Sequence, residues 1–154
     1  MESVGFAHSP RQQLATHWFR WQDTRMAQPV RRRLPQTVVH AIDQSKILGI
    51  RAGARSDHRY IGVWPVVVDG RVFARSWTLK PSGWNRTFLE DPRGTMQAGD
   101  REVRIRALPV RGERLRDAIE DAYAEKYPTP SSRAYVRGFR TARRRATTME
   151  FVPR

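Results

Sequence analysis

The chain has 154 residues, which is enough for one domain with a terminal extension. Hydrophobic residues make up 39% and charged residues 29%, which excludes fully disordered and collagen-like classes. No apolar run approaches the roughly 18 residues of a membrane span, and the N-terminus lacks the apolar core of a secretory signal. Cysteine is absent, which excludes disulfides, thiolate nucleophiles and Cys-type metal sites. We therefore expect a cytoplasmic protein without a membrane partner.

The net charge of +14 favours phosphate-bearing partners such as nucleic acid or nucleotides. The basic residues are 26 Arg and only 3 Lys, however, and an Arg bias of this kind also follows from a GC-rich genome. Both explanations remain open at this point.

Residues 1–34 show no sustained hydrophobic period and carry 6 basic against 2 acidic residues. We predict a basic, disordered N-terminal arm here and a single folded domain over residues 35–154. The aromatic cluster at 17–21 is the exception within the arm. Met26 offers an alternative start of translation.

The folded part is expected to begin with a helix and a short strand. Residues 36–46 place Val38, Val39 and Ile42 on one helical face, and the apolar run 47–50 follows. Next, two β-branched and aromatic runs over 59–68 and 71–77 flank Asp69-Gly70. This pattern is the strongest short-range signal for a hairpin.

The second half of the domain alternates in the same way. Ser82 is expected to cap a short helix that ends before Pro92, with Trp84, Phe88 and Leu89 on its inner face. The remaining predicted elements are a hairpin over 94–109, a helix over 113–127, a short helix capped by Ser131 and a strand over 146–152. Together these elements predict a mainly β fold with helices: six antiparallel strands in a small barrel with three to four short helices.

The sequence contains no phosphate-binding glycine loop, no nucleophile elbow and no evident carboxylate pair. His40 and Asp43 have helical spacing, but two ligands do not make a metal site, so no metal is expected. A bound cofactor would supply the chemistry that these side chains lack. No catalytic residue can be named.

The order of elements from Arg59 to Val110 resembles a known superfamily. A hairpin ends in Ala74-Arg75-Ser76-Trp77, a Pro/Gly turn leads to Gly83-Trp84-Asn85-Arg86, and a second hairpin follows Asp91-Pro92-Arg93-Gly94. This order is similar to that of the split β-barrel proteins that bind FMN or a deazaflavin, above all the deazaflavin-dependent nitroreductase-like branch. Within it the chain looks most like an uncharacterised bacterial family.

The resemblance implies a six-stranded split β-barrel, a homodimer and a cofactor cleft at the dimer interface. It places the cofactor phosphate on basic and hydroxyl groups after the first hairpin, namely Arg75, Ser76, Lys80 and Arg86. Trp64 and Trp77 are then expected to stack on the cofactor ring and Val67 to lie beneath it. The alternatives are solvent-exposed arginines and ordinary barrel core.

The expected function is therefore that of an FMN- or deazaflavin-binding protein, an oxidoreductase that transfers hydride to a small-molecule substrate. The sequence departs from the superfamily at Asn85, where a tyrosine is expected, which puts an aromatic hydroxyl near the substrate in doubt. The competing hypothesis is a non-enzymatic basic barrel that binds nucleic acid or another protein, with Arg104 and Arg106 on one strand face. Binding to nucleic acid is expected to be weak and nonspecific.

Overall fold

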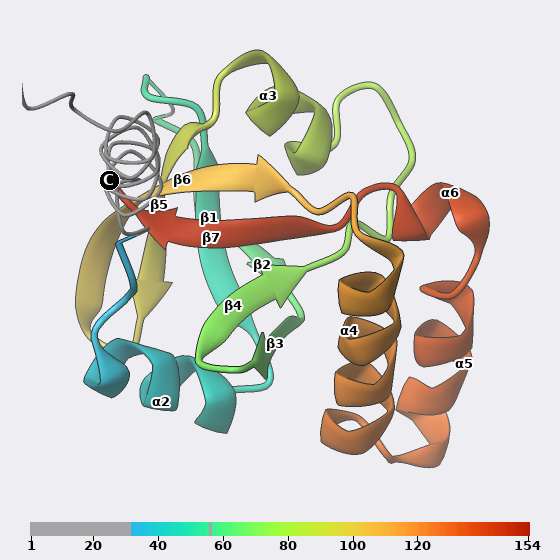
Figure 1. Ribbon diagram of the computed structural model, residues 1–154. Coiled ribbons are helices and arrows are strands. Elements are labelled where there is room, and N and C mark those ends of the chain that lie inside the picture. Colours follow the sequence, from blue (N-terminus) through green and yellow to red (C-terminus); the bar gives the residue numbers. More distant parts are fainter. Residues whose placement is uncertain (1–31, 56) are drawn as a thin grey trace, which may run out of the picture. The chain divides into compact units, whose positions relative to one another are not determined.

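The structure is a computed structural model that describes residues 32–55 and 57–154 (Figure 1). The predicted basic arm over 1–34 and the alternative start at Met26 lie almost entirely outside the described residues. None of the helices in the described part combines the length and the apolar character that a membrane span requires.

Seven antiparallel strands form one sheet that curls into a nearly closed barrel (Figure 1). Their order across the sheet is β2-β1-β5-β6-β7-β4-β3. The strands are β1 (Leu48–Ala52), β2 (Ile61–Val63), β3 (Pro65–Val68), β4 (Arg71–Ala74), β5 (Arg93–Ala98), β6 (Arg101–Pro109) and β7 (Met149–Pro153). The two edge strands, β2 and β3, are consecutive in the chain, with only Trp64 between them.

The structure corrects the predicted number of strands, because the segment expected as one strand over 59–68 is two. β2 pairs with β1 at one edge of the sheet, whereas β3 pairs with β4 at the other. Pro65 begins β3 and has no N–H to donate, so a single strand cannot run through it.

Both predicted hairpins are confirmed. At the first turn, Asp69 and Gly70 have φ angles of 52° and 71°, the left-handed values that a type I′ turn requires at both central positions. In the second hairpin, predicted over 94–109, β5 pairs with β6 and the chain turns at Gly99-Asp100. Asp-Gly and Gly-Asp therefore set the register of four of the seven strands that the structure describes.

Five helices are present in the described part, one or two more than expected. They are α2 (Gln36–Gln44), α3 (Trp84–Glu90), α4 (Glu113–Lys126), α5 (Pro130–Gly138) and α6 (Ala142–Arg145). Two predicted caps are wrong. The N-cap of α3 is Gly83 rather than Ser82, and the N-cap of α5 is Thr129 rather than Ser131. The Thr129 hydroxyl accepts a hydrogen bond from the backbone N–H of Ser132.

Two hydrophobic cores hold the domain together. The first fills the barrel and includes the buried face of α2, which carries the predicted Val38, Val39 and Ile42. The second lies between β3, β4 and the helices α4 and α5, and it includes Phe73 and Tyr123. The strand β4 is therefore covered on both faces, with Val72 and Ala74 in the first core and Phe73 in the second.

Helix α3 packs against β1, it buries Trp84 and Phe88 in the first core, and its Phe88 ring lies against Gly94 of β5. Leu89, expected on the same inner face, is instead 55% exposed, because residues one position apart on a helix point in different directions. A Cβ at Gly94 of β5 would stand 2.4 Å from the Arg51 carbonyl oxygen and 2.7 Å from the Phe88 ring. Glycine is thus required for the close approach of α3 to the barrel.

Candidate functional site

An open pocket of about 480 Å³ lies where β2, the end of β4, α3 and α5 meet. Its wall is dominated by large hydrophobic side chains. Three tryptophans, a tyrosine and a phenylalanine contribute, together with two aliphatic residues: Trp64, Trp77, Trp84, Tyr135, Phe139, Ile61 and Val63. A concave site with a mostly apolar wall and few polar groups is the usual form of a small-molecule site.

The rim of this pocket is an exposed hydrophobic surface. Five large hydrophobic side chains are exposed in the described part, and three of them, Ile61, Trp77 and Tyr135, belong to the pocket. The rings of Trp77 and Tyr135 meet edge to face at 4.8 Å between centroids. Exposed apolar side chains gathered at one hollow mark a binding surface more often than scattered ones do.

Trp64 forms the inner wall of the pocket and is held in place by Tyr127 and Tyr123. Its ring stacks on that of Tyr127, with the centroids 4.4 Å apart and the planes 11° from parallel. The hydroxyl of Tyr123 donates to the Trp64 carbonyl oxygen at 2.7 Å and accepts a hydrogen bond from the backbone N–H of Arg75 at 3.0 Å. Burial raises the pKa of the Tyr123 hydroxyl, which therefore stays neutral and keeps both hydrogen bonds.

Trp77 is held against α5 and α6. A Cβ at Gly138 would stand 2.4 Å from Cζ3 of Trp77, so the ring lies directly on the glycine backbone. The guanidinium carbon of Arg144 lies 4.0 Å from the Trp77 ring centroid, and its Nε donates to the Trp77 carbonyl oxygen at 2.9 Å. A cation over the indole face fixes the ring and places a positive charge at the rim.

Arg75 lines the pocket, but its side chain is fully buried and its nitrogens donate to protein groups. Nε donates to the Thr148 hydroxyl at 2.8 Å, and Nη2 to the Arg116 carbonyl oxygen at 2.9 Å. Nη1 donates to the Phe139 carbonyl oxygen and to the Glu120 carboxylate. Burial lowers the pKa of Arg75, and the nearby Glu120 opposes that effect. In this arrangement the guanidinium joins β4 to α4 and α5.

The other residues expected at a cofactor phosphate do not gather around Arg75. Ser76 is buried, and its hydroxyl donates to the Thr78 carbonyl oxygen at 2.8 Å. Lys80 and Arg86 are exposed and make no side-chain ion pair within the described part. Val67 lines a different hollow, beside Lys126. Of the seven expected site residues, the pocket wall contains Trp64, Arg75 and Trp77.

Sequence reasoning missed Tyr135, Phe139 and Arg144. The segment 131–141 gave no clear periodicity, so no side chain in it could be assigned to a site. Tyr135 and Phe139 are four residues apart at the end of α5, which places both on the side that meets Trp77. The four-residue spacing of these two aromatic residues is the one feature of the sequence that could have indicated their place in the site.

A buried polar atom without a partner lies beside the pocket. The Oδ1 of Asn85 has no hydrogen-bond partner among the described residues, although its side chain is buried. A Cβ at Gly83 would stand 3.1 Å from this oxygen and 3.0 Å from Cγ2 of Thr78, a residue of the pocket wall. Buried acceptors normally have a donor, so Asn85 offers a position for a donor from water or a ligand.

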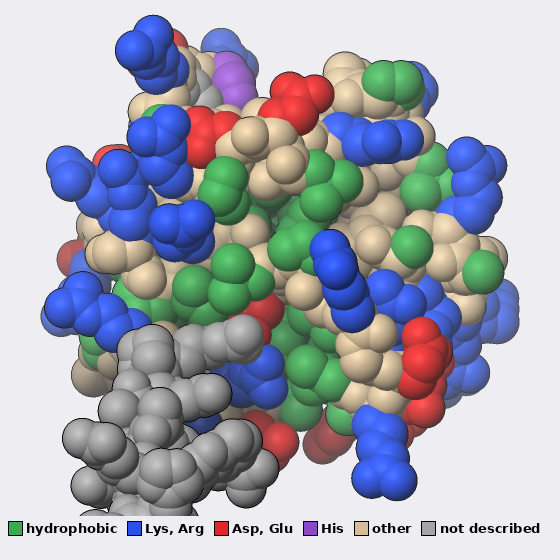
Figure 2. All heavy atoms as spheres, turned by 45° about the horizontal axis from the view of Figure 1, so that its top comes forward, with side chains coloured by type: hydrophobic (Ala, Val, Ile, Leu, Met, Phe, Trp, Pro, Cys, Tyr) green, Lys and Arg blue, Asp and Glu red, His purple; other side chains and the backbone are tan. Residues whose placement is uncertain are grey.

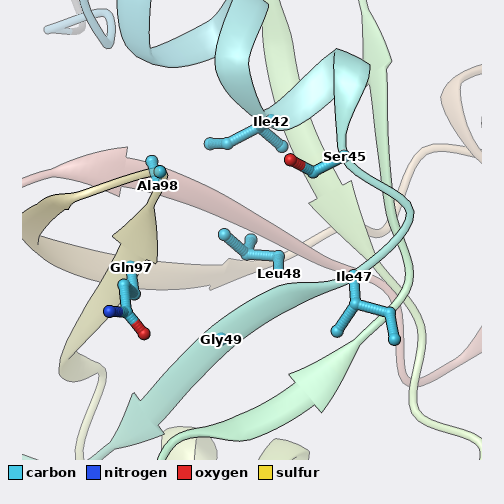
Figure 3. Close-up of a pocket in the computed structure, with 8 residues that line it drawn as sticks. Ile42, Ser45, Ile47, Leu48, Gly49, Gln97 and Ala98 are labelled. Atoms are coloured by element: carbon cyan, nitrogen blue, oxygen red, sulfur yellow. The ribbon is translucent and has the colours of Figure 1, made fainter.

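Another hollow, of about 310 Å³ and distinct from the one beside Val67, lies between the end of α2 and the strands β1 and β5 (Figure 3). Ile42 and Ser45 approach it from the helix, with Leu48 and Gln97 below. The Ser45 hydroxyl donates to the Ala41 carbonyl oxygen within its own helix. No charged side chain lines this hollow in the described part, so it has no group for acid–base chemistry or for binding an anion.

Neither hollow contains the side chains of a metal site. Within residues 32–55 and 57–154, no group of three or more His, Cys, Asp or Glu side chains is placed to hold a metal ion. His40 and Asp43 are both exposed on α2. The main pocket offers aromatic side chains for stacking, with the Arg144 guanidinium against Trp77.

Comparisons with known proteins identify a family and a similar fold. A family described as uncharacterized proteins conserved in bacteria (DUF2255) matches residues 37–151. The crystal structure of a conserved hypothetical protein from Mycobacterium tuberculosis has a similar fold, with 14% identity and a TM-score of 0.53 over 82% of this chain and 85% of that chain. A second solved structure, described as a domain-swapped dimer, is 21% identical with a TM-score of 0.49 over 91% and 99% of the two chains. No curated protein matches the sequence.

Proposed function

The chain belongs to this family of uncharacterised bacterial proteins, and we propose that it binds a flavin-type cofactor, FMN or a deazaflavin, in the aromatic pocket. Membership confirms the bacterial family expected from the order of elements. The observation that carries the proposal is the wall of the pocket. Trp64 and Trp77 both line the hollow; Trp64 is fixed by stacking on Tyr127, and Trp77 is fixed by Arg144. Preordered indole rings favour a flat aromatic ligand because little ordering remains to be done on binding.

The dimensions and charge of the pocket support the same ligand class. A volume of about 480 Å³ lies within the usual range of small-molecule sites. Arg144 lies against Trp77 of the pocket, Lys80 is exposed between β4 and α3, and Arg86 is exposed on α3. A cation beside an aromatic hollow suits a ligand that carries both a ring and a phosphate.

The resemblance to split β-barrel proteins adds the expected reaction. A bound flavin or deazaflavin would supply hydride transfer to a small-molecule substrate, as in an oxidoreductase. The residues of this chain would bind and orient the ring through Trp64 and Trp77 and would keep water from its inner face.

The proposal includes a homodimer. The pocket is open on the side where Ile61, Trp77 and Tyr135 are exposed, and a second copy of the chain would cover these side chains. Burying them would also exclude water from a bound cofactor.

Titration with FMN and with a deazaflavin, followed by cofactor fluorescence, tests the proposal. The parent should bind one of them, and Trp77→Ala should weaken binding by about tenfold or more, because a stacked ring is lost. Leu89→Ala is the matched control, since Leu89 is an exposed hydrophobic residue that does not line the pocket. If the parent binds neither cofactor, the proposed function is wrong. If Leu89→Ala weakens binding as much as Trp77→Ala does, the pocket is not the site.

A further inference from the structure

Arginine side chains gather on the outer face of β1, β5 and β6. Ile50, Met96 and Ile105 of these strands are buried in the barrel core, so the alternate residues point outward. Four of those outward residues are arginines, which together we call the arginine face: Arg51, Arg93, Arg104 and Arg106.

The strand register brings these side chains together. Thr95 of β5 lies between Arg51 of β1 and Arg104 of β6, and Arg93 lies directly opposite Arg106. Neighbouring strands are about 4.8 Å apart, and alternate residues of one strand are about 6.6 Å apart. The four guanidinium groups therefore share one small area of the sheet.

Nearby carboxylates neutralise only part of this charge. Asp91 accepts a hydrogen bond from Nε of Arg93 at 2.9 Å, and Glu102 accepts one from the Tyr60 hydroxyl at 2.7 Å. Arg104 and Arg106 are exposed and make no side-chain hydrogen bond or ion pair within the described part of the chain. Like charges on neighbouring strands destabilise a sheet, so this cluster has a cost in the free protein.

Arg51 is held in place without an acceptor. Its guanidinium carbon lies 4.0 Å from the centroid of the Tyr60 ring, while its Nε is buried and has no hydrogen-bond partner among the described residues. The stacking orders the side chain, and it covers one face of the Tyr60 ring. The arginine face thus presents oriented cations rather than free aromatic rings.

We propose that the arginine face binds the phosphate backbone of nucleic acid. Guanidinium groups form bidentate hydrogen bonds with phosphate oxygens, and a row of them matches a ligand with regularly repeated charges. No free aromatic ring accompanies them on these strands, so bases are not stacked and binding does not depend on sequence. Figure 2 shows Lys and Arg side chains spread over the visible face among fewer Asp and Glu side chains, in keeping with the net charge of +14. None of the four arginines lines the aromatic pocket.

The test is fluorescence anisotropy of the full-length protein with a short labelled oligothymidine over a series of salt concentrations. The logarithm of the association constant should fall linearly with the logarithm of salt concentration. Arg104→Gln combined with Arg106→Gln should reduce the magnitude of this slope by about 1.4, because each phosphate contact to a single strand contributes about 0.7.

Arg133→Gln combined with Arg137→Gln on α5 is the matched control, because it removes the same charge from another exposed surface. It should leave the slope close to that of the parent, and Trp77→Ala should bind the oligonucleotide as the parent does. The proposal is overturned by equal effects of the two double variants, which would indicate diffuse charge. It is also overturned if the parent binds vesicles of anionic lipid but not the oligonucleotide.

Discussion

Nη1 of Arg75 lies 3.3 Å from the Glu120 carboxylate inside the domain, and Glu120 also accepts a hydrogen bond from Arg145. Arg145 in turn pairs with Glu113 and Asp117 on the same helix as Glu120. One network of charges therefore links β4, α4 and the end of α6. It supports the pocket from behind, because the backbone N–H of Arg75 bonds to the hydroxyl that also holds Trp64.

Arg75→Ala should destabilise the fold. The substitution removes a fully buried side chain and leaves the Thr148 hydroxyl and two backbone carbonyls without their donor. We expect a loss of about 2–5 kcal/mol in the free energy of unfolding. Urea denaturation followed by circular dichroism measures this loss. Arg86→Ala, which changes an exposed arginine, should stay within about 0.5 kcal/mol of the parent. Similar midpoints for both variants would contradict the structural role of Arg75.

The burial of Arg75 shows where sequence reasoning reached its limit. The sequence could not show that α4 and α5 would cover the Arg75 side chain, because that depends on packing between segments about 45 residues apart or more. An arginine on an outer face was therefore expected to meet solvent or a ligand, whereas helix carbonyls and a carboxylate surround it.

Local signals predicted more of the fold than of the site. Asp69-Gly70 determined one hairpin, and helical spacing determined α2 and α4, because these patterns lie within a few residues. The pocket instead combines Trp64 and Trp77 with Tyr135, which is brought to them by the packing of α5. Aromatic residues in the strands could be proposed from the sequence, but their partner on the helix could not.

Gly138→Ala should displace Trp77. The new Cβ would stand 2.4 Å from the indole ring, and the half-exposed ring can move away from it. The free energy of unfolding should change little, because two effects oppose each other. Alanine favours the helix by about 1 kcal/mol over glycine, whereas contacts of the Trp77 ring are lost. Tryptophan emission should shift, and binding of a flat ligand should weaken. Gly112→Ala, which has open space around its Cβ, should leave the emission unchanged. An unchanged spectrum for Gly138→Ala would show that Trp77 does not rest on Gly138.

Asp91→Asn should alter stability in acid. Hydrogen bonds from Arg93 and from the backbone N–H of Ala54 lower the pKa of Asp91 in the folded protein. A carboxyl whose pKa is lower in the folded state stabilises the fold above its unfolded pKa of about 3.9, and this contribution is lost as the pH falls towards the folded pKa. The variant should therefore lose less stability than the parent below about pH 4. Thermal melts across this range provide the measurement, with Asp100→Asn at the β5–β6 turn as the control. Identical pH profiles for Asp91→Asn and the parent would exclude this contribution.

The proposed homodimer should depend on the rim of the pocket. Tyr135→Lys places a charge among exposed apolar side chains and should shift the protein towards a monomer in light scattering. Leu89→Lys changes an equally exposed hydrophobic residue on α3 and should leave the mass unchanged. If the parent is monomeric at micromolar concentration, the proposed homodimer is wrong.

The single residue between β2 and β3 has a consequence for local opening of the barrel. These strands are the two edges of the sheet, and no ladder of hydrogen bonds joins them within the described part. Each edge strand is hydrogen-bonded to a single neighbour, β2 to β1 and β3 to β4, whereas β6 is paired on both sides. Amide hydrogens of β2 and β3 should therefore exchange with solvent when one pairing frays, whereas those of β6 should wait for global unfolding. Because Trp64 joins the two edge strands and lines the pocket, a ligand stacked on its ring would slow exchange at both edges together.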